Sequence, residues 1–288
     1  MCFENLSDDH SPSSAELFLD TSIHCSKLKG SLFQQRITDV FDLFQWKSTS
    51  TYTQVEFGNV VLAQAEYYLR ELNKFRSLEK LKDHIGNALW HKSHSIKITW
   101  SFNLLAVYGQ NDAECTERAK LSLQRMMKLG VDFVEKLCDR PLQDGTNCYW
   151  ASRGVCKKRD GTLVWKSPQC KPNRKRCHLD DFFDKNRGTF KQIKDAIDKL
   201  PESTKSKQLN GFSEVIGLAL VDSAILLDYR TGCKRLADAI IAVDSKEYRS
   251  MFSQNVKESE LLTSVLGQAF YYLPPNCDKG VKVRVVDD

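Results

Sequence analysis

The stretch LFLDTSI (Leu17–Ile23) is an apolar run that ends in an acid and two hydroxyl residues. Residues 16–19 fit a short buried strand, and Asp20 fits the turn from that strand into a helix, because Asp, Thr and Ser are good N-cap residues. In open α/β sheets, ligands bind beyond the carboxyl ends of the strands. The stretch therefore predicts an α/β fold with Asp20 at the edge of the sheet where a ligand would bind.

Two more segments place a single acid at or near the start of a helix. They are TYTQVEFGNV (Thr51–Val60), with Glu56, and LADAIIAV (Leu236–Val243), with Asp238. Mg²⁺ and Mn²⁺ prefer oxygen ligands, so carboxylates that converge at one sheet edge are suited to bind them. A cation held in this way can activate water against a phosphodiester. We therefore expect Asp20, Glu56 and Asp238 to bind Mg²⁺ or Mn²⁺ if they meet in space.

The rest of the chain alternates helical patterns with short apolar strands, which predicts an α/β domain with a mainly parallel sheet. Beyond the first strand, strands are expected at residues 250–255, with the exit turn included, and at Ala269–Pro275. The expected helices cover residues 28–44, 53–75, 77–89, 112–137, 189–200, 212–229 and 256–267. Asn255 would stand at the carboxyl end of the second of these strands, on the same edge as the acids.

In these segments the chain resembles the PIN-domain (PilT N-terminus-like) nucleases. LFLDTSI resembles the family's first strand with its acid, and TYTQVEFGNV and LADAIIAV resemble its second and third acidic motifs. FSQNVKESELLTSVLG, followed by FYYLP, resembles the closing strand, turn, helix and strand. The resemblance implies a three-layer α/β enzyme that uses Mg²⁺ or Mn²⁺ to hydrolyse single-stranded RNA. The catalytic positions that it implies are Asp20, Glu56, Asp238 and Asn255, the first three of them as metal ligands.

The resemblance covers about residues 15–75 and 210–275. We therefore expect residues 15–75 and 210–288 to form a PIN-like nuclease core, and residues 76–209 to be a large, mostly helical insertion. The polar residues 1–14 are expected to be a disordered leader.

One position departs from the family pattern. The family often has an acid where Asn255 stands, and an amide offers an oxygen ligand without the charge, which lowers affinity for a cation. This departure favours a second hypothesis, a non-catalytic nucleic-acid-binding protein on a degenerate PIN-like scaffold. A second alignment is also open, with Asp222 as the third acid and Asp244 as the fourth.

Each of the three acids also has an ordinary structural interpretation. Asp20 fits a helix N-cap, and Glu56 fits the third position of a capping box that begins at Thr53. Asp238 fits an exposed acid in the first turn of a helix, where the helix dipole favours negative charge. The metal-site interpretation depends on the three side chains lying at one edge.

A cysteine-rich, basic segment lies at about residues 139–180, inside the expected insertion. Four of its cysteines fall within thirty residues of one another, at Cys148, Cys156, Cys170 and Cys177. Four thiolates can hold a structural Zn²⁺, and a short loop with little apolar content needs such a centre to fold. An iron–sulfur cluster is the alternative, because it takes the same four ligands.

Positive charge is concentrated in the same segment. Residues 145–177 contain nine Lys and Arg against a single acid. A local excess of this size predicts an anionic partner, most simply nucleic acid, although a solvated charge run would have the same composition. The side chains expected to contact nucleic acid are Arg153, Lys157, Lys158, Arg159, Lys166, Arg174, Lys175 and Arg176.

Composition sets the broad class. The chain has 288 residues, 41% of them hydrophobic, and a net charge of +5. Its apolar runs are too short to span a bilayer and its N-terminus has no apolar signal segment, so we expect a cytoplasmic protein without a membrane partner. Because an unrestrained ribonuclease is toxic, we also expect an inhibitory protein partner. The sequence leaves the oligomeric state open.

Overall fold

The computed structural model describes most of the chain that the sequence analysis assigned to the core. The described residues are 16–27, 31–90, 109–130, 134, 136–140, 145–146, 155–157, 163–165, 178–228, 232–273 and 282–284. The expected leader at residues 1–14 lies outside these ranges.

A five-stranded sheet with the strand order β2-β1-β5-β6-β7 forms the centre of the molecule. Strands β2, β1, β5 and β6 are parallel, and β7 pairs antiparallel with β6. The five strands are β1 (Glu16–Leu19), β2 (Trp46–Ser48), β5 (Ser250–Phe252), β6 (Ala269–Tyr272) and β7 (Lys282–Arg284). The predicted α/β class with a mainly parallel sheet is therefore confirmed.

The two faces of the sheet belong to different apolar clusters. Leu17 and Leu19 pack on one face with Ile37 of the helix α2, whereas Phe18 points into the larger cluster on the other face. This division follows from the strand period of two, which sends successive side chains to opposite faces. Both faces of β1 are thus buried, which explains its continuous apolar sequence.

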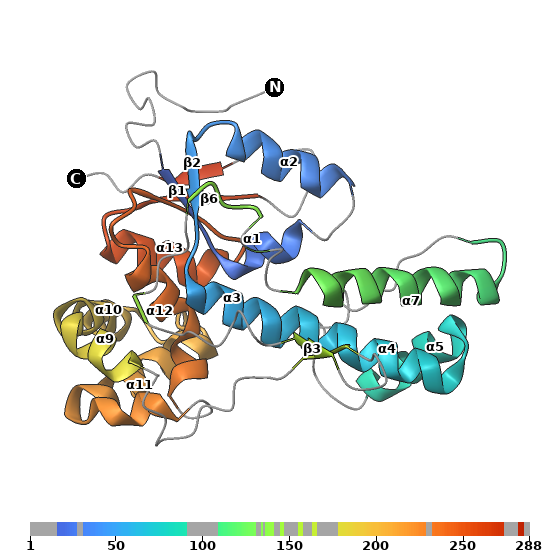
Figure 1. Ribbon diagram of the computed structural model, residues 1–288. Helices are drawn as coiled ribbons and strands as arrows, with labels where there is room; N and C mark the ends of the chain where they lie inside the picture. The colour runs from blue at the N-terminus through green and yellow to red at the C-terminus, as the bar shows by residue number, and fades with distance from the viewer. Residues whose placement is uncertain are drawn as a thin grey trace.

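Helices account for most of the remaining described chain (Figure 1). The first half contains α1 (Thr21–Ser26), α2 (Ser31–Phe41), α3 (Thr51–Phe57), the π-helical turn η1 (Gly58–Leu62), α4 (Ala63–Phe75), α5 (Leu78–Trp90) and α7 (Asp112–Leu129). The second half contains α9 (Leu179–Lys185), α10 (Arg187–Lys199), α11 (Lys207–Val221), η3 (Ser223–Leu227), η4 (Cys233–Leu236), α12 (Ala237–Asp244) and α13 (Val256–Val265). A separate two-stranded hairpin pairs β3 (Val155–Lys157) with β4 (Leu163–Trp165).

The helices α4, α5 and α7 lie side by side and extend away from the sheet, as the right-hand part of Figure 1 shows. They are connected to the sheet region through α3 and η1, which run into α4. The same long helical stretch therefore begins at the edge of the sheet and ends in the extended helical layer. None of the helices in the described ranges is long and apolar enough to cross a membrane.

Several predicted boundaries move in the structure. The predicted helix at residues 112–137 ends at Leu129, because Gly130 follows with a φ of 54° and caps it. The predicted helix at residues 212–229 begins earlier and ends at Val221, after which Asp222 caps the short helix η3. Strands β2 and β7 and the β3–β4 hairpin were not predicted.

Candidate metal centre

Asp20 follows the last residue of β1 and begins α1. Its backbone N–H donates to the carbonyl oxygen of Phe252, which continues the pairing of β1 with β5. Its side chain is 4% exposed and accepts from the backbone N–H and the hydroxyl of Ser22. The hydroxyl of Ser253 donates to the same carboxylate oxygen at 2.8 Å. Asp20 is therefore an N-cap as well as a member of the site described below.

Glu56 lies in the last full turn of α3. The helix is capped by Ser50, whose side chain accepts from the backbone N–H of Thr53, so Glu56 comes six residues after the cap. The capping-box interpretation, with Thr53 as the cap and Glu56 three residues later, is wrong. The hydroxyl of Thr21 donates to Oε2 of Glu56 at 2.5 Å and thus connects α1 with α3.

Asp238 lies in the first turn of α12, as the helix-dipole interpretation also predicts, but other side chains cover it and it is only partly exposed. The amide nitrogen of Asn255 donates to its Oδ2 at 3.0 Å, and the amide of Gln208 on α11 donates to the same oxygen. Asn255 thus contacts the third carboxylate as a hydrogen-bond donor.

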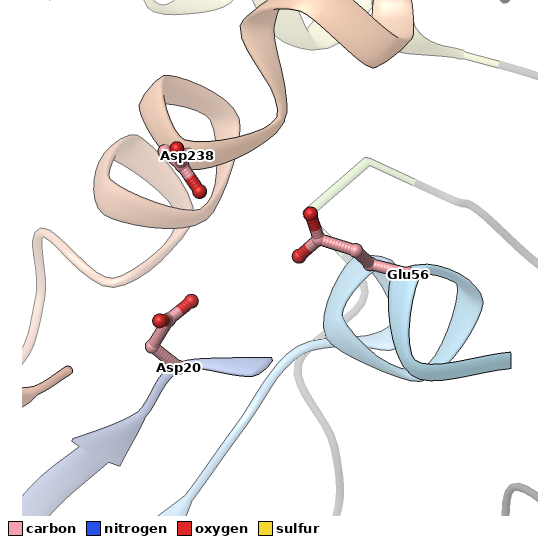
Figure 2. Close-up of side chains that lie close together, drawn as sticks. All are labelled: Asp20, Glu56 and Asp238. Atoms are coloured by element: carbon pink, nitrogen blue, oxygen red, sulfur yellow. The ribbon is translucent and has the colours of Figure 1, made fainter. Parts of the chain in front are cut away.

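These three carboxylates converge on one point, although they come from segments far apart in the sequence (Figure 2). One oxygen from each of Asp20, Glu56 and Asp238 lies within 4.8 Å of the others. The convergence arises because α3 contacts both α1 and α12 beyond the carboxyl end of β1. Within the described ranges this is the single group of three or more acid, histidine or cysteine side chains placed to share a metal ion.

Electrostatics at this point is unfavourable without a counter-charge. Burial raises the pKa of Glu56 to about 7, and the carboxylate of Asp20 adds to the rise. Burial also raises the pKa of Asp238 well above its ordinary value, and Glu56, Asp20 and Glu258 add to that rise. Like charges that share a buried site favour the protonated form, which explains both directions.

The arrangement fits a hard divalent cation. No lysine or arginine in the described part of the chain forms a salt bridge with any of the three carboxylates. The site consists of carboxylate oxygens with hydroxyl and amide donors behind them, which is the ligand chemistry that Mg²⁺ and Mn²⁺ prefer. A cation at this point would supply the missing positive charge.

Three further residues of the site were not predicted from the sequence. Ser253 is fully buried and donates to Asp20, and Gln208 donates to Asp238. Glu258 on α13 is 6% exposed, accepts from the hydroxyl of Ser206 and adds negative charge near Asp238. Glu258 lies three residues after Asn255, in the first turn of α13. An acid is therefore present about one helical turn after Asn255, although position 255 itself has an uncharged amide.

The second alignment receives no support from the geometry. Asp222 is exposed and caps η3, and Asp244 lies at the far end of α12 from Asp238. Neither belongs to the carboxylate group. The first alignment, with Asp238 as the third acid, is the one that brings the acids together.

None of the four cysteines or eight basic residues that the sequence analysis named in this segment has a described side chain. Cys148, Cys170 and Cys177 lie outside the described residues, and Cys156 belongs to β3, which is described as a strand only. Of the basic residues, Lys157 is also in β3. The others lie outside the described ranges, namely Arg153, Lys158, Arg159, Lys166, Arg174, Lys175 and Arg176. The zinc and nucleic-acid predictions for this segment therefore stay predictions.

Comparisons with models of protein families, with curated proteins and with solved structures found no match.

Proposed function

We propose that the protein is a Mg²⁺- or Mn²⁺-dependent endoribonuclease that hydrolyses single-stranded RNA at Asp20, Glu56 and Asp238, on a PIN-like domain. The observation that supports this proposal is the convergence of three partly or fully buried carboxylates within 4.8 Å of one another at the carboxyl edge of a parallel sheet. A divalent cation bound there would polarise the scissile phosphate and lower the pKa of its water.

The residues around the three acids have distinct roles in this proposal. Asp20 is positioned by Ser22 and Ser253, and Asp238 by Asn255 and Gln208, so both carboxylates are held in place as ligands. Glu56 has one oxygen tied to Thr21, which leaves Oε1 to accept a proton from the attacking water. Without a cation, burial and the Asp20 carboxylate raise the pKa of Glu56 to about 7. A bound cation would lower this pKa, so Glu56 would be ionised and able to accept the proton near neutral pH.

A nucleic-acid-binding protein without catalysis is the second candidate. It is favoured by Asn255, which is uncharged and donates its amide to Asp238 where the family often has another acid. In this case a cation bound by the carboxylate cluster would only neutralise the negative charge of the phosphates on the bound strand. The two candidates predict the same binding and differ in whether the strand is cut.

The cysteine-rich segment completes the proposal. We expect residues 139–180 to hold a structural Zn²⁺ through Cys148, Cys156, Cys170 and Cys177, with an iron–sulfur cluster as the alternative. The positive side chains of this segment would attract the RNA backbone, which an acidic cleavage site does not. Metal analysis of the purified chain separates the two: zinc without visible absorbance, or iron with a brown colour.

The decisive experiment is cleavage of end-labelled single-stranded RNA in Mn²⁺. We compare the wild type, the double variant Asp20→Asn and Asp238→Asn, and Asp222→Asn as a matched control that changes an exposed acid outside the cluster. The proposal predicts cleavage by the wild type and the control and none by the double variant. Tight RNA binding without cleavage by folded wild type, in both Mg²⁺ and Mn²⁺, would favour the second candidate.

A further inference from the structure

A pocket of about 200 Å³ lies directly beside the carboxylate cluster. Glu56 belongs to both, so whatever fills the pocket touches the site where the strand would be cut. The pocket is bounded by α3, η1 and the start of α4 on one side, and by η4 and the start of α12 on the other. It is smaller than the pockets of about 300–1,000 Å³ that hold drug-sized molecules, so it suits one small ring system.

The π-helical turn η1 shapes one wall of this pocket. Asn59 and Val60, both in the turn, line it, and Val60 is 38% exposed. π-helical turns are uncommon and often occur at functional sites, because they disturb the regular helical hydrogen bonding. An irregular part of the long α3–α4 helical stretch therefore forms the pocket wall next to the carboxylate cluster.

Gln64, at the start of α4, lines this pocket and has an unmet hydrogen-bonding capacity. Its amide oxygen is buried and has no hydrogen-bond partner. A buried unsatisfied oxygen is unfavourable, and turning the amide toward a ligand that donates to it would relieve the penalty. A glutamine amide offers one acceptor and two donors in one plane, which matches the hydrogen-bonding edge of a nucleobase.

The rest of the lining is mainly apolar. The hydroxyl of Tyr52 donates to the backbone carbonyl of Cys233 at 2.9 Å, which fixes the position of the tyrosine ring. Two valines and an alanine complete the apolar lining. Lys234 is exposed and reaches the same pocket, so it can neutralise a phosphate at the mouth.

We propose that this pocket receives one base of a single-stranded nucleic acid, with the Gln64 amide reading its edge and Lys234 contacting the adjacent phosphate. The inference rests on the proposed function, because that function places the nucleic-acid strand beside Glu56. It makes Gln64 a determinant of base preference next to the scissile bond. Binding in the pocket does not depend on whether the strand is then cut.

The test measures binding separately from cleavage. The full chain is prepared with Asp20→Asn and Asp238→Asn, which removes two charges and the proposed activity. Fluorescence anisotropy then follows binding of labelled eight-nucleotide RNAs that contain A, C or U alone, or alternating G and U. To this background we add Gln64→Leu, Lys234→Gln, or Gln35→Leu on the exposed surface of α2 as a matched control.

We expect the tightest and weakest RNAs to differ by about fivefold or more, as an amide contact with a base edge gives. Gln64→Leu should reduce this ratio to less than about twofold, and Lys234→Gln should weaken all four RNAs alike with a smaller dependence on salt. Gln35→Leu should change neither. Circular dichroism and thermal unfolding verify that Gln64→Leu is folded, as expected when an unsatisfied buried oxygen is removed.

Equal binding of the four RNAs, no binding of any, or a preference that survives Gln64→Leu would overturn the pocket proposal. Failure of the proposed function is a different result, in which wild type binds with a base preference that depends on Gln64 but does not cleave. The two proposals can therefore fail separately.

Discussion

At the scale of single residues, Glu56 connects metal binding to pH. Its raised pKa of about 7 means that a cation must displace a proton over much of the range below neutrality. We expect Mn²⁺ affinity to rise between pH 6 and pH 8, by up to about tenfold per pH unit for each proton displaced below its pKa. Isothermal titration calorimetry at several pH values, in buffers of different ionisation enthalpy, counts the protons. A flat affinity with no proton release would contradict this assignment.

The same shift affects the stability of the metal-free protein. The folded-state pKa of Glu56 lies above its ordinary value of 4.5, so the folded state binds more protons between pH 4.5 and about 7. Stability from this group is therefore complete below pH 4.5 and is lost as pH rises through about 7. The full shift corresponds to on the order of 3 kcal/mol.

We therefore expect Glu56→Gln to stabilise the metal-free protein at pH 8 by on the order of 1–3 kcal/mol, with little effect at pH 4.5. Urea unfolding in chelator at both pH values measures it. Asp222→Asn, at an exposed acid outside the cluster, should change the free energy of unfolding little at either pH. Saturating Mn²⁺ should reverse the order of wild type and Glu56→Gln at pH 8.

The three acids were predictable from the sequence because each stands in a recognisable local pattern. Asp20 follows an apolar strand, and Glu56 and Asp238 stand in or near the first turns of helices. The donors behind them were not predictable, because their roles depend on pairing across the chain. Ser253, for example, reaches Asp20 only because β5 lies beside β1.

At the scale of elements, α3 positions Glu56 through its N-terminal cap. Ser50 is fully buried, and its hydroxyl accepts from the backbone N–H of Thr53. We expect Ser50→Ala to lower the free energy of unfolding by about 1 kcal/mol and also to weaken Mn²⁺ binding. Asn111→Ala is the matched control, since Asn111 caps α7 through the N–H of Glu114.

Thermal unfolding and Mn²⁺ titration of both variants give the comparison. Both substitutions should lower the free energy of unfolding by a similar amount. Asn111→Ala should nevertheless bind Mn²⁺ with the affinity of the wild type. If the two variants bind Mn²⁺ equally well, the cap of α3 does not position Glu56.

The elements that the sequence did not predict are short or lack a strong pattern. Strand β2 has three residues with a lysine at its centre, so no apolar alternation marks it, and its parallel pairing with β1 defines it. The π-helical turn η1 lies inside one continuous amphipathic stretch, where periodicity predicts an uninterrupted helix. In both cases tertiary contacts decide the local structure, and a local pattern does not contain them.

At the scale of the whole molecule, the site depends on two distant parts of the chain. Asp20 follows β1, Asp238 precedes β5, and these strands pair in parallel at the centre of the sheet. Contacts between α3 and α12 also join the first and last parts of the described chain. The strands of this sheet come from residues 16–48 and 250–284, while α10 packs on the same core. The expected split of the core into residues 15–75 and 210–288 stays a prediction.

This arrangement predicts that cutting the chain between the two parts leaves the site intact. Residues 201–204 are exposed between α10 and α11, so a protease recognition sequence inserted there can be cleaved in the folded protein. We expect the two fragments to elute together in size-exclusion chromatography and to bind Mn²⁺ within about threefold of the uncut chain, because the buried strand pairing of β1 with β5 holds them. Cutting should lower the unfolding temperature, since the fragments gain entropy when they separate. Fragments that separate in native buffer, or that stay together without binding Mn²⁺, would show that the covalent connection is needed to hold Asp20 and Asp238 at one site.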